Sequence, residues 1–390
     1  MRVRGKINIG ERELTGVHFF QGNDACVEGA IAAGCNLFAG YPITPATEIS
    51  ERMSRRIFEV GGIFVQGADE LDSLALVIGS VWGGWKAMTA TAGNGICLMQ
   101  ENIGFSAMTE TPCVIVDVQR AGPATGAATK SMQGDVYQVR YGSNADYSII
   151  ALAPNSPQEM FDLTVEAFNL AEIYRVPTFI LADEIVGHMR EKVIIPEFGE
   201  IEVIKRKKPE VKPEDFIPFH VDSDIDVPTM PVLGDGYRMP VSDFTHTETG
   251  TPSVDYEVHK KLITRLWNKV EKNKGKLSNV EEYFLEDSEI AVLSYGSVAR
   301  SAYEAVFNSN EKGIKAGYLR LITLWPFPDR LVKSLAEQVK VILVPEMNMG
   351  KIVREVQRAA EGEAKVVSIP KPGIEVHTPD EIMSEIRRLI

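Results

Sequence analysis

Four residues with chemically useful groups stand at comparable places in the first half of the chain: Thr44, Glu70, Gly93 and Arg120. Each lies at or shortly after the end of an apolar run of the kind that forms a buried strand. A hydroxyl, a carboxylate, a flexible backbone and a guanidinium can together exchange protons, approach a ligand closely and bind an anion. Because the turns that follow parallel strands open on one edge of a sheet, we expect the four groups to converge there.

Glu70 is the central residue of this set. In residues 62–79, GIFVQGADELDSLALVIG, a β-branched and aromatic run predicts a buried strand over 63–65, and apolar residues at helical spacing predict a helix after it. Asp69 is the expected N-cap, so the Glu70 carboxylate would face the positive end of the helix dipole. Taken alone, Glu70 is more simply a first-turn glutamate that complements the dipole. The similar geometry of the three other turns favours a functional role.

The elements that must position these residues alternate along the chain. Helices are expected over residues 22–34 (with Asn23 as a possible cap), 46–60, 96–109 and, behind a capping box formed by Ser156 and Glu159, up to about 174. Buried strands are expected over residues 36–41, 63–65, 86–93, 113–119, 147–153 and 177–183. This order predicts an α/β fold, a doubly wound parallel sheet with helices on both faces.

Composition divides the chain into three parts. Residues 1–191 are expected to form the first α/β domain, including an N-terminal arm. Residues 192–285 are rich in proline and charge, which predicts an irregular connector with one helix over 256–273. Residues 286–390 have the pattern of a second, smaller α/β domain. Because no dense set of polar groups marks that last domain, we expect it to serve packing or an interface rather than catalysis.

Composition also excludes several classes of protein. A formal net charge of −13 argues against nucleic-acid binding, and the basic run at residues 205–208 is too short to reverse that, so we expect it on a solvated linker. No apolar stretch is long enough to span a bilayer, and the N-terminus lacks the apolar core of a signal peptide, so we expect a cytoplasmic location. The cysteines form no C-x-x-C pair, which argues against a zinc or iron–sulfur site in this chain and for buried, reduced thiols. They are Cys26, Cys35, Cys97 and Cys113.

Longer stretches around these residues carry a family resemblance. GNDACVEGAIAAGCNLFAGYPITPATEIS, the E-x-x-S helix start after Gln66, LMQENIGFSAMTETPCVIVDVQRAGPATG and DEIVGHMRE resemble the α subunit of 2-oxoacid:ferredoxin oxidoreductases, and the 2-oxoglutarate type most closely. The likeness is dense over residues 20–191 and looser over 285–390. It implies the thiamine-diphosphate pyrimidine-binding fold for the first domain and a fold like the transketolase C-terminal domain for the last.

The resemblance implies an enzyme that oxidatively decarboxylates a 2-oxoacid, 2-oxoglutarate being the expected one, on thiamine diphosphate. Coenzyme A would accept the acyl group and ferredoxin the electrons. This chain would supply the pyrimidine-binding half of a site between subunits, and a separate β subunit would carry the diphosphate site with Mg²⁺ and an iron–sulfur cluster. Gly234-Asp235-Gly236 resembles the start of a thiamine-diphosphate metal motif, but the asparagine pair expected downstream is missing. We therefore interpret it as a turn and expect no metal site in this chain.

Three residues receive roles from the resemblance. Glu70 matches the family carboxylate that contacts the aminopyrimidine ring, where a carboxylic acid would favour the imino tautomer that can deprotonate the thiazolium carbon. Arg120 matches the arginine whose planar fork binds the 2-oxoacid carboxylate, although a salt bridge to Asp117 or Asp135 is an equally simple interpretation. Thr44 matches the loop threonine that contacts the same carboxylate or the carbonyl, and ordinary turn chemistry is its alternative.

Further positions follow from the same resemblance. It implies that the cofactor is also bound by Pro42, Ile43, Gly93, Asn94 and Asn102. Thr125 and Lys130 would lie near the substrate, and Lys130 or Arg140 would either meet a second carboxylate or be a surface charge. Many relatives carry an acidic residue where this chain has Ala68, and a glycine-serine turn where it has Ala124-Thr125. Both departures lie near the expected pocket, so the sequence leaves the identity of the 2-oxoacid open.

Two other functions are compatible with these residues. A non-redox thiamine enzyme of the transketolase or decarboxylase type would use the same half-site, and the cysteine content of its partner would distinguish it. A non-catalytic scaffold subunit with a vestigial pocket would not need Thr44, Glu70 and Arg120 together, so their joint presence argues against it.

Overall fold

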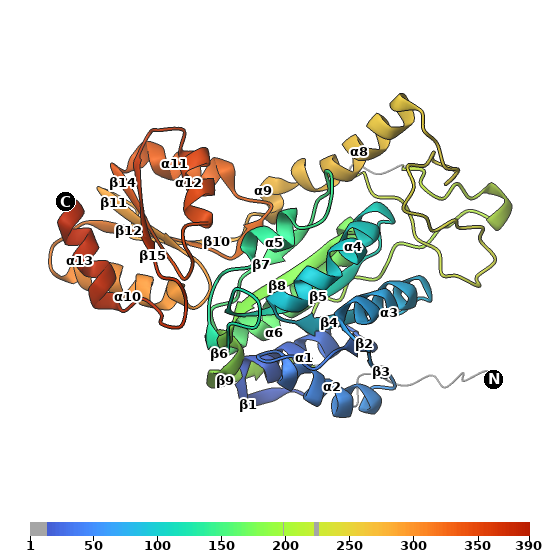
Figure 1. The fold of residues 1–390 in the computed structure, drawn as a ribbon, viewed down its shortest axis with the longest axis horizontal. Helices are drawn as coiled ribbons and strands as arrows, with labels where there is room; N and C mark the ends of the chain where they lie inside the picture. Colours follow the sequence, from blue (N-terminus) through green and yellow to red (C-terminus); the bar gives the residue numbers. More distant parts are fainter. Residues whose placement is uncertain (1–13, 198, 222–225) are drawn as a thin grey trace.

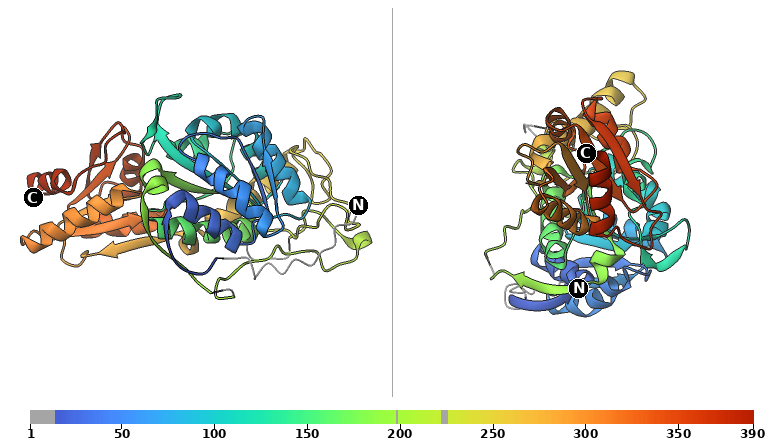
Figure 2. Two further views of the ribbon diagram at one scale, coloured as in Figure 1. Left: turned by 90° about the horizontal axis from the view of Figure 1, so that it is seen from below. Right: turned by 90° about the vertical axis from the view of Figure 1, so that its left-hand side faces the viewer.

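The computed structural model describes residues 14–197, 199–221 and 226–390, so most of the expected N-terminal arm lies outside the described residues. Two sheets carry the fold, one of eight strands and one of five. The smaller sheet lies at one end of the molecule and the irregular connector at the other, with the larger sheet between them (Figure 1, Figure 2). The larger sheet therefore forms the centre of the structure.

The larger sheet is parallel along most of its width, which confirms the predicted fold class. Its strand order is β13-β7-β8-β5-β4-β2-β3, and β6 pairs with β5 beside this path. Each pair from β7 to β3 is parallel, whereas β13 and β6 run antiparallel to their neighbours. The strands are β2 (Leu37–Gly40), β3 (Ile63–Gln66), β4 (Ala87–Thr91), β5 (Cys113–Ala121), β6 (Ala127–Ser131), β7 (Ile150–Leu152), β8 (Pro177–Asp183) and β13 (Thr323–Trp325).

Helices cover both faces of this sheet because its strands are apolar on both sides. The covering helices are α1 (Gly22–Ala32), α2 (Thr47–Glu59), α3 (Glu70–Trp82), α4 (Gly93–Met108), α5 (Val136–Tyr141) and α6 (Pro157–Tyr174). Along β5, Val114 and Val116 pack in the cluster that contains α1, α2 and α6, whereas Ile115 packs with α3, α4 and α5. β2, β3 and β4 are each followed directly by a helix, so α2, α3 and α4 begin at the edge where these parallel strands end.

The C-terminal sheet has the order β10-β12-β11-β14-β15, and only β10 among these is antiparallel to its neighbour. Its strands are β10 (Val280–Tyr283), β11 (Ile290–Ser294), β12 (Ala316–Leu321), β14 (Val341–Glu346) and β15 (Lys365–Pro370). Its helices are α10 (Val298–Glu311), α11 (Asp329–Gln338), α12 (Ile352–Ala360) and α13 (Pro379–Leu389). The last helix was not expected from the sequence, although Thr378 and Glu381 form a complete capping box at its start.

The segments that flank the connector are ordered. β1 (Gly16–Gln21) pairs antiparallel with β9 (Arg190–Ile195), which follows the short helix α7 (Glu184–His188). Beyond β9 the described chain is mainly irregular, with a 3₁₀ turn η2 (Pro213–Asp215), the helix α8 (Tyr256–Glu271) and the short helix α9 (Lys274–Leu277). The expected helix in the connector is thus present as α8.

A buried charged cluster anchors α8 to the first part of the chain. Glu110 is 0% exposed, and its carboxylate accepts hydrogen bonds from Arg265 at 2.6 and 2.9 Å and from Lys269 at 3.0 Å. Arg175 joins the cluster by donating to the Glu110 carbonyl at 2.8 Å. Although burial alone would raise it, Arg265 and Lys269 hold the pKa of the Glu110 carboxyl well below its usual range. One carboxylate therefore balances several buried cations.

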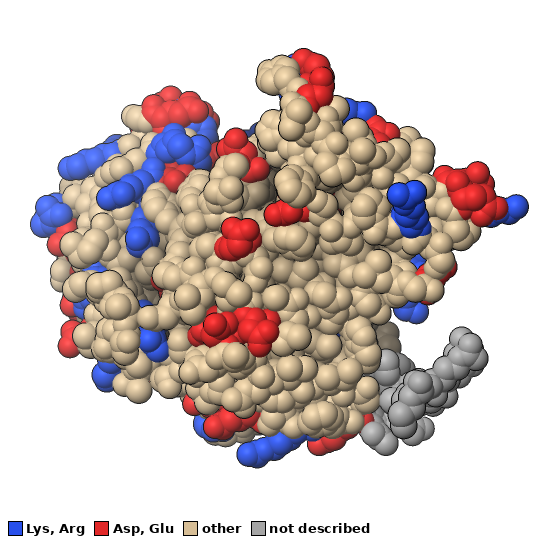
Figure 3. All heavy atoms as spheres, turned by 45° about the vertical axis from the view of Figure 1, so that its right-hand side comes forward, with Lys and Arg blue, Asp and Glu red and all other residues tan. Residues whose placement is uncertain are grey.

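The outer surface of α3 and α4, which we call the α3–α4 face, is poor in charge. Its exposed apolar residues include Leu71, Leu76 and Leu98, while α3 has no charged residue after Asp72 and α4 has Glu101 alone. On the side of the molecule shown in Figure 3, basic side chains keep to the margins and the middle carries only scattered acidic patches. Among the described residues, no helix combines the length and the apolar character that crossing a membrane requires.

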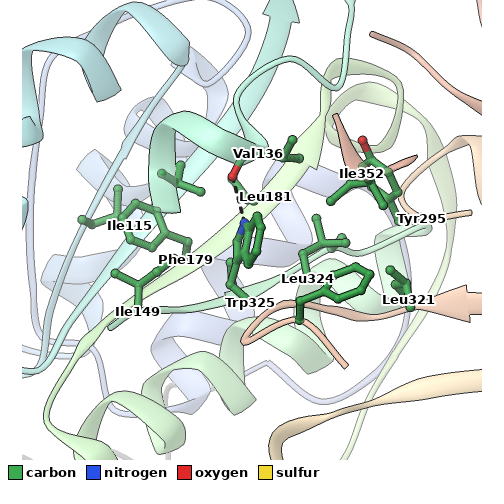
Figure 4. Close-up of a cluster of buried hydrophobic side chains, with 14 of the residues drawn as sticks. Ile115, Val136, Ile149, Phe179, Leu181, Tyr295, Leu321, Leu324, Trp325 and Ile352 are labelled. Atoms are coloured by element: carbon green, nitrogen blue, oxygen red, sulfur yellow. Dashed lines mark hydrogen bonds between the residues drawn. The ribbon is translucent and has the colours of Figure 1, made fainter. Parts of the chain in front are cut away.

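One hydrophobic cluster joins the two sheets. It contains Ile115 and Leu181 from the larger sheet together with Leu321 and Ile352 from the C-terminal part. Trp325 of β13 lies in the middle of this cluster, and its indole Nε1 donates to the Val136 carbonyl at 2.8 Å (Figure 4). Because β13 comes from the C-terminal part and pairs with β7, the two parts share both a sheet and a core.

Several local predictions are wrong because of tertiary neighbours. β3 is an edge strand rather than a buried one, and Ile63 is 39% exposed. Asn23 does not cap α1, because its Nδ2 donates to the Pro45 carbonyl at 2.9 Å. The expected capping box at α6 is half formed: Ser156 accepts from the Glu159 amide, but the Glu159 carboxylate bonds to the amide of Asn155 and to Arg320.

Two predictions about surface chemistry also need correction. Arg206, within the basic run expected on a solvated linker, is mostly buried and pairs with Glu172 at 2.9 Å. Cys97 is exposed on α4 and so is not a core thiol. The other three cysteines, Cys26, Cys35 and Cys113, are buried as predicted, and burial raises the pKa of each thiol to about 12.

We predict that Glu110→Gln lowers the free energy of unfolding by about 3–5 kcal/mol, because removing one partner of a buried ion pair leaves the other charges uncompensated. Urea unfolding of the full chain would measure it. The matched control is Glu248→Gln, whose carboxylate pairs with Lys261 at the surface and should contribute at most about 1 kcal/mol. Equal effects of the two substitutions would contradict an anchoring role for the Glu110 cluster.

Candidate active site

Glu70 is the first residue of α3, at the place where the sequence predicts it. β3 ends at Gln66, and the Asp69 side chain caps α3 by accepting a hydrogen bond from the Asp72 amide at 2.8 Å. The turn between them is fastened to the end of β2, because the Gly67 amide donates to the Gly40 carbonyl at 3.1 Å. Glu70 is 4% exposed, and no described residue donates a hydrogen bond to its carboxylate. The carboxylate is therefore available to a ligand.

The first turn of α4 lies directly against Glu70. A Cβ atom added at Gly95 would lie 2.5 Å from Glu70 Cγ and would also overlap the Thr91 hydroxyl, so only glycine fits there. Asn102 fastens the two helices together by donating to the Leu71 carbonyl at 2.8 Å. The positive ends of two helix dipoles thus meet at one carboxylate, which favours negative charge and ligand anions at this edge.

Arg120 and Thr44 are in contact across the same edge. Arg120 is 8% exposed, and its Nη1 donates to the Thr44 carbonyl at 2.8 Å. Its Nε is buried without a hydrogen-bond partner. In the described part of the chain no carboxylate forms an ion pair with it, so the alternative of a salt bridge to Asp117 or Asp135 is not observed. The rest of the guanidinium fork is free to bind an anion.

The loop that carries Thr44 is held by two residues of other elements. The Pro45 carbonyl accepts from Asn23 and lies 3.2 Å from His188 Nε2, whose other ring nitrogen is 3.1 Å from Glu184 Oε1. The hydrogen bond to Glu184 raises the pKa of His188. Sequence reasoning missed His188, although it lies within the DEIVGHMRE segment. The two prolines stiffen the loop, and these contacts fix its position.

Asp135 connects the α4 turn to β5. A Cβ added at Gly93 would lie 2.6 Å from Asp135 Oδ2, so the carboxylate packs against the glycine backbone. The Asp135 amide donates to Gln119 Oε1 at 3.0 Å, next to Arg120. An unbroken series of contacts therefore runs from Glu70 through α4, Asp135 and β5 to Thr44. This series connects the four groups along one edge of the sheet, and their joint role in a site stays a prediction.

The remaining expected residues are placed less centrally. Thr125 and Lys130 are exposed on the β5–β6 hairpin, and Pro42 is exposed on the Thr44 loop. Arg140 does not reach the edge: it is buried, donates to the Tyr147 carbonyl at 2.7 Å and stacks on Tyr141 and Trp267. Gly234 and Gly236 adopt positive φ, as expected of a turn. No cluster of three potential metal ligands is found among the described side chains.

Sequence reasoning did not identify the carboxyl groups of Asp117 and Asp135 as functional candidates. Asp117 on β5 is 0% exposed, and burial together with Asp135 raises its pKa well above the usual range. Burial also raises the pKa of Asp135, to about 6. The available signal was a charged residue within an apolar strand, CVIVDVQ.

Glu70, Thr44 and Arg120 lie on an open edge rather than in a closed cavity. The chain's large hollow, with a volume of about 1140 Å³, lies along α8 and the connector and is lined by none of these residues. A site that is open on one side would require a second surface to exclude water.

Two family models match the chain. The model for pyruvate flavodoxin/ferredoxin oxidoreductase, thiamine diphosphate-binding, matches residues 28–265, and the model for pyruvate:ferredoxin oxidoreductase core domain II matches residues 288–382. The first match includes all of the candidate site, and the second covers most of the C-terminal sheet.

Three individual proteins are similar along almost the whole chain. The 2-oxoglutarate synthase subunit KorA of Methanocaldococcus jannaschii is 54% identical, over 94% of this chain and 98% of that protein. The subunit of the same name from Methanothermobacter thermautotrophicus is 51% identical, over 96% and 100%. A solved structure of 2-oxoglutarate:ferredoxin oxidoreductase from Magnetococcus marinus, with 2-oxoglutarate, coenzyme A and succinyl-CoA bound, matches with a TM-score of 0.90 at 29% identity. That match covers 96% of this chain, which spans 65% of the length of the Magnetococcus chain.

We predict that Gly95→Ala displaces the Glu70 side chain and lowers the free energy of unfolding by about 1–3 kcal/mol, because the added methyl group has no room. Gly79→Ala in α3 is the matched control: nothing lies within 4 Å of its Cβ position, so alanine should be neutral or stabilise by up to about 1 kcal/mol. Chemical denaturation measures both. A Gly95→Ala variant as stable as the control would show that α4 does not press on Glu70.

Proposed function

We propose, for a chain that belongs to the pyruvate flavodoxin/ferredoxin oxidoreductase family, that the edge around Glu70 supplies one half of a 2-oxoacid-decarboxylating active site. The chain is the α subunit of a 2-oxoacid:ferredoxin oxidoreductase, and its first part is a thiamine diphosphate-binding domain. The observation that carries the proposal is the buried Glu70 carboxylate, which lies where two helices begin and has no hydrogen-bond donor among the described residues.

The residues at this edge fit the pyrimidine half of thiamine diphosphate. Glu70 would share a proton with the ring nitrogen, and Gly93 and Gly95 would let the α4 backbone approach the ring, with Asn94, Asn102, Pro42 and Ile43 around it. When bound, the cofactor supplies the thiazolium carbon that attacks the 2-oxoacid. The role of Glu70 is to orient that proton toward the ring nitrogen from a side chain that is 4% exposed.

Arg120 would bind the carboxylate of the 2-oxoacid. Its Nη1 is fixed by the Thr44 carbonyl, which orients the plane of the guanidinium and leaves its other N–H groups free. The Thr44 hydroxyl would complete the contact with the carboxylate or the carbonyl oxygen. A fork that is already oriented loses less side-chain freedom when it binds a planar carboxylate.

The substrate we propose is 2-oxoglutarate, with coenzyme A as acyl acceptor and ferredoxin as electron acceptor. The support is that the two KorA relatives are named 2-oxoglutarate synthase subunits and that the similar Magnetococcus structure holds 2-oxoglutarate and succinyl-CoA. Lys130 and Thr125, on the neighbouring β5–β6 hairpin, are the candidates for the second carboxylate of such a substrate. Arg140 is not a candidate, because it is turned into the protein.

The second half of the site would come from a β subunit that carries the diphosphate site, Mg²⁺ and an iron–sulfur cluster. The α3–α4 face supports this, because Leu71, Leu76 and Leu98 expose apolar surface on the two helices that begin at this edge. The name of the relatives, subunit KorA, also implies further subunits. A non-redox thiamine enzyme would need the same half-site, and the iron content of the co-purified partner distinguishes the two.

We predict that Glu70→Gln slows hydrogen–deuterium exchange at the thiazolium carbon by about 10²–10⁴-fold in the assembled complex, because an amide cannot share an acidic proton with the ring. Its effect on the free energy of unfolding should stay within about 1 kcal/mol, since the amide keeps the shape of the side chain. Nuclear magnetic resonance after acid quench measures the exchange. Glu257→Gln, an exposed change on α8, is the control. If exchange in Glu70→Gln is as fast as in the wild type, Glu70 only starts helix α3 and has no role at the ring.

We predict that Arg120→Lys lowers kcat/KM for 2-oxoglutarate by about 2–3 kcal/mol of transition-state binding, because a point charge replaces the fork. Steady-state assays of the complex with a ferredoxin or a viologen acceptor measure it. Arg190→Lys on β9, an exposed position away from the edge, should leave the kinetics unchanged. Normal kinetics in a folded Arg120→Lys enzyme would place Arg120 outside the substrate site.

A further inference from the structure

The buried carboxyl of Asp117 is not used by the function proposed above. It lies on the central strand β5, opposite Thr91 of β4, on the face of the sheet that α4 covers. Asp117 is 0% exposed, and both of its carboxylate oxygens are buried without a hydrogen-bond partner among the described residues. An ionised carboxylate in such surroundings is strongly disfavoured, whereas the neutral acid is tolerated.

Asp135, whose charge acts on Asp117, lies against Gly93 at the start of α4. Its carboxylate packs against the backbone of Gly93, and its amide is held by Gln119. The charged groups that face it are Arg120 from β5 and Lys351, which precedes α12 in the C-terminal part. Cys97 of α4 and Asp135 itself are the titratable groups that face Asp117. Cations therefore act on Asp135, whereas the groups that act electrostatically on Asp117 are a carboxyl and a thiol.

These different surroundings separate the pKa values of the Asp117 and Asp135 carboxyl groups. Burial raises the pKa of Asp135 to about 6, against the lowering effect of Lys351 and Arg120. Burial and the neighbouring Asp135 charge raise the pKa of Asp117 well above its usual range. Near neutral pH the pair then carries one negative charge, on Asp135, and one proton, on Asp117.

We propose that Asp117 and Asp135 hold a single proton between them, on Asp117, and that this proton limits the negative charge which the wall beside Arg120 presents to an anionic substrate. Asp117 is in this sense a positioning residue, since it acts on the substrate only through the field at Arg120. The part that concerns the substrate rests on the proposed binding of the 2-oxoacid carboxylate by Arg120. The location of the proton does not depend on any substrate.

The consequence is a pH-dependent affinity for the 2-oxoacid. As the pH rises through the deprotonation of Asp117, a second negative charge appears behind Asp135 and opposes the substrate carboxylates. With the effective dielectric constant of a protein surface, one added unit charge near the substrate should raise KM about 3–10-fold. The effect should appear in KM, because the substrate carboxylates carry their full charge when the substrate binds.

The first experiment locates the proton without any turnover. Infrared spectra of the complex made with ¹³C-labelled aspartate should show the band of a protonated carboxyl at pH 7, absent in Asp117→Asn and retained in Asp146→Asn, an exposed control. If that variant does not fold, absence of the band from the wild-type spectrum still overturns the proposal, and Asp183→Asn, at another buried aspartate whose pKa is raised, should retain the band. Absence of the band would overturn the proposal, and it would leave the proposed function untouched if the enzyme turns over normally.

Thermal unfolding of the same complexes gives a second readout with a defined sign. A carboxyl whose folded-state pKa is raised contributes stability that is fully present below its unfolded pKa and is lost as the pH rises through the folded pKa. The melting temperature of the wild type should therefore fall relative to Asp117→Asn as the pH rises above neutrality. Parallel melting curves across pH 6–9 would contradict a buried proton on Asp117.

The kinetic experiment tests the effect on substrate. In the wild type, KM for 2-oxoglutarate should rise over the pH range in which the infrared band of the protonated carboxyl disappears, and in Asp117→Asn it should stay at the low-pH value of the wild type, since the amide is always neutral. A wild-type KM that is flat with pH, in an enzyme that shows the infrared band, would overturn the control of substrate charge. If no 2-oxoacid is turned over, the proposed function fails while the infrared result still stands.

Discussion

The candidate site depends on the contact between the first turn of α4 and the side chain of Glu70. Gly95 leaves no room for a methyl group, so the backbone of one helix and the carboxylate of another are held at van der Waals distance. This closeness brings two helix dipoles to bear on one buried charge, which a helix end tolerates better than an apolar wall does. The remaining links through Asp135, Gln119 and Arg120 all start from the position of that turn.

The parallel sheet explains why so much of this edge could be predicted from the sequence. When strands are parallel, each strand-to-helix turn opens on the same side, so order along the chain is enough to place Thr44, Glu70 and Gly93 together. Asp69 caps α3 as expected because its side chain finds the Asp72 amide within the same turn. The likeness of segments around these residues added their chemical roles, which periodicity does not contain.

What the sequence could not supply depends on neighbours that are distant in the chain. Asn23 looks like a helix cap, yet it bonds to the Pro45 carbonyl, and β3 looks buried, yet it lies at the edge of the sheet as far as the described residues extend. In the sequence, Asp117 is a single acidic residue within an apolar strand. Only the structure shows that its oxygens have no partner and that Asp135 lies beside it. The same holds for His188, which contacts the Thr44 loop from a helix more than a hundred residues away.

The C-terminal part has more influence on the edge than its lack of a polar constellation suggested. β13 pairs with β7, and the carboxyl of Asp183, at the end of β8, accepts from the Ser297 amide at 2.8 Å. Gln133, on the segment that leads to Asp135, accepts from the Met347 amide and donates to the Tyr295 carbonyl. These bonds place Lys351 where its charge lowers the pKa of Asp135. The C-terminal part therefore contributes to the electrostatic field at Asp135, and the shared core leaves it little freedom to move away.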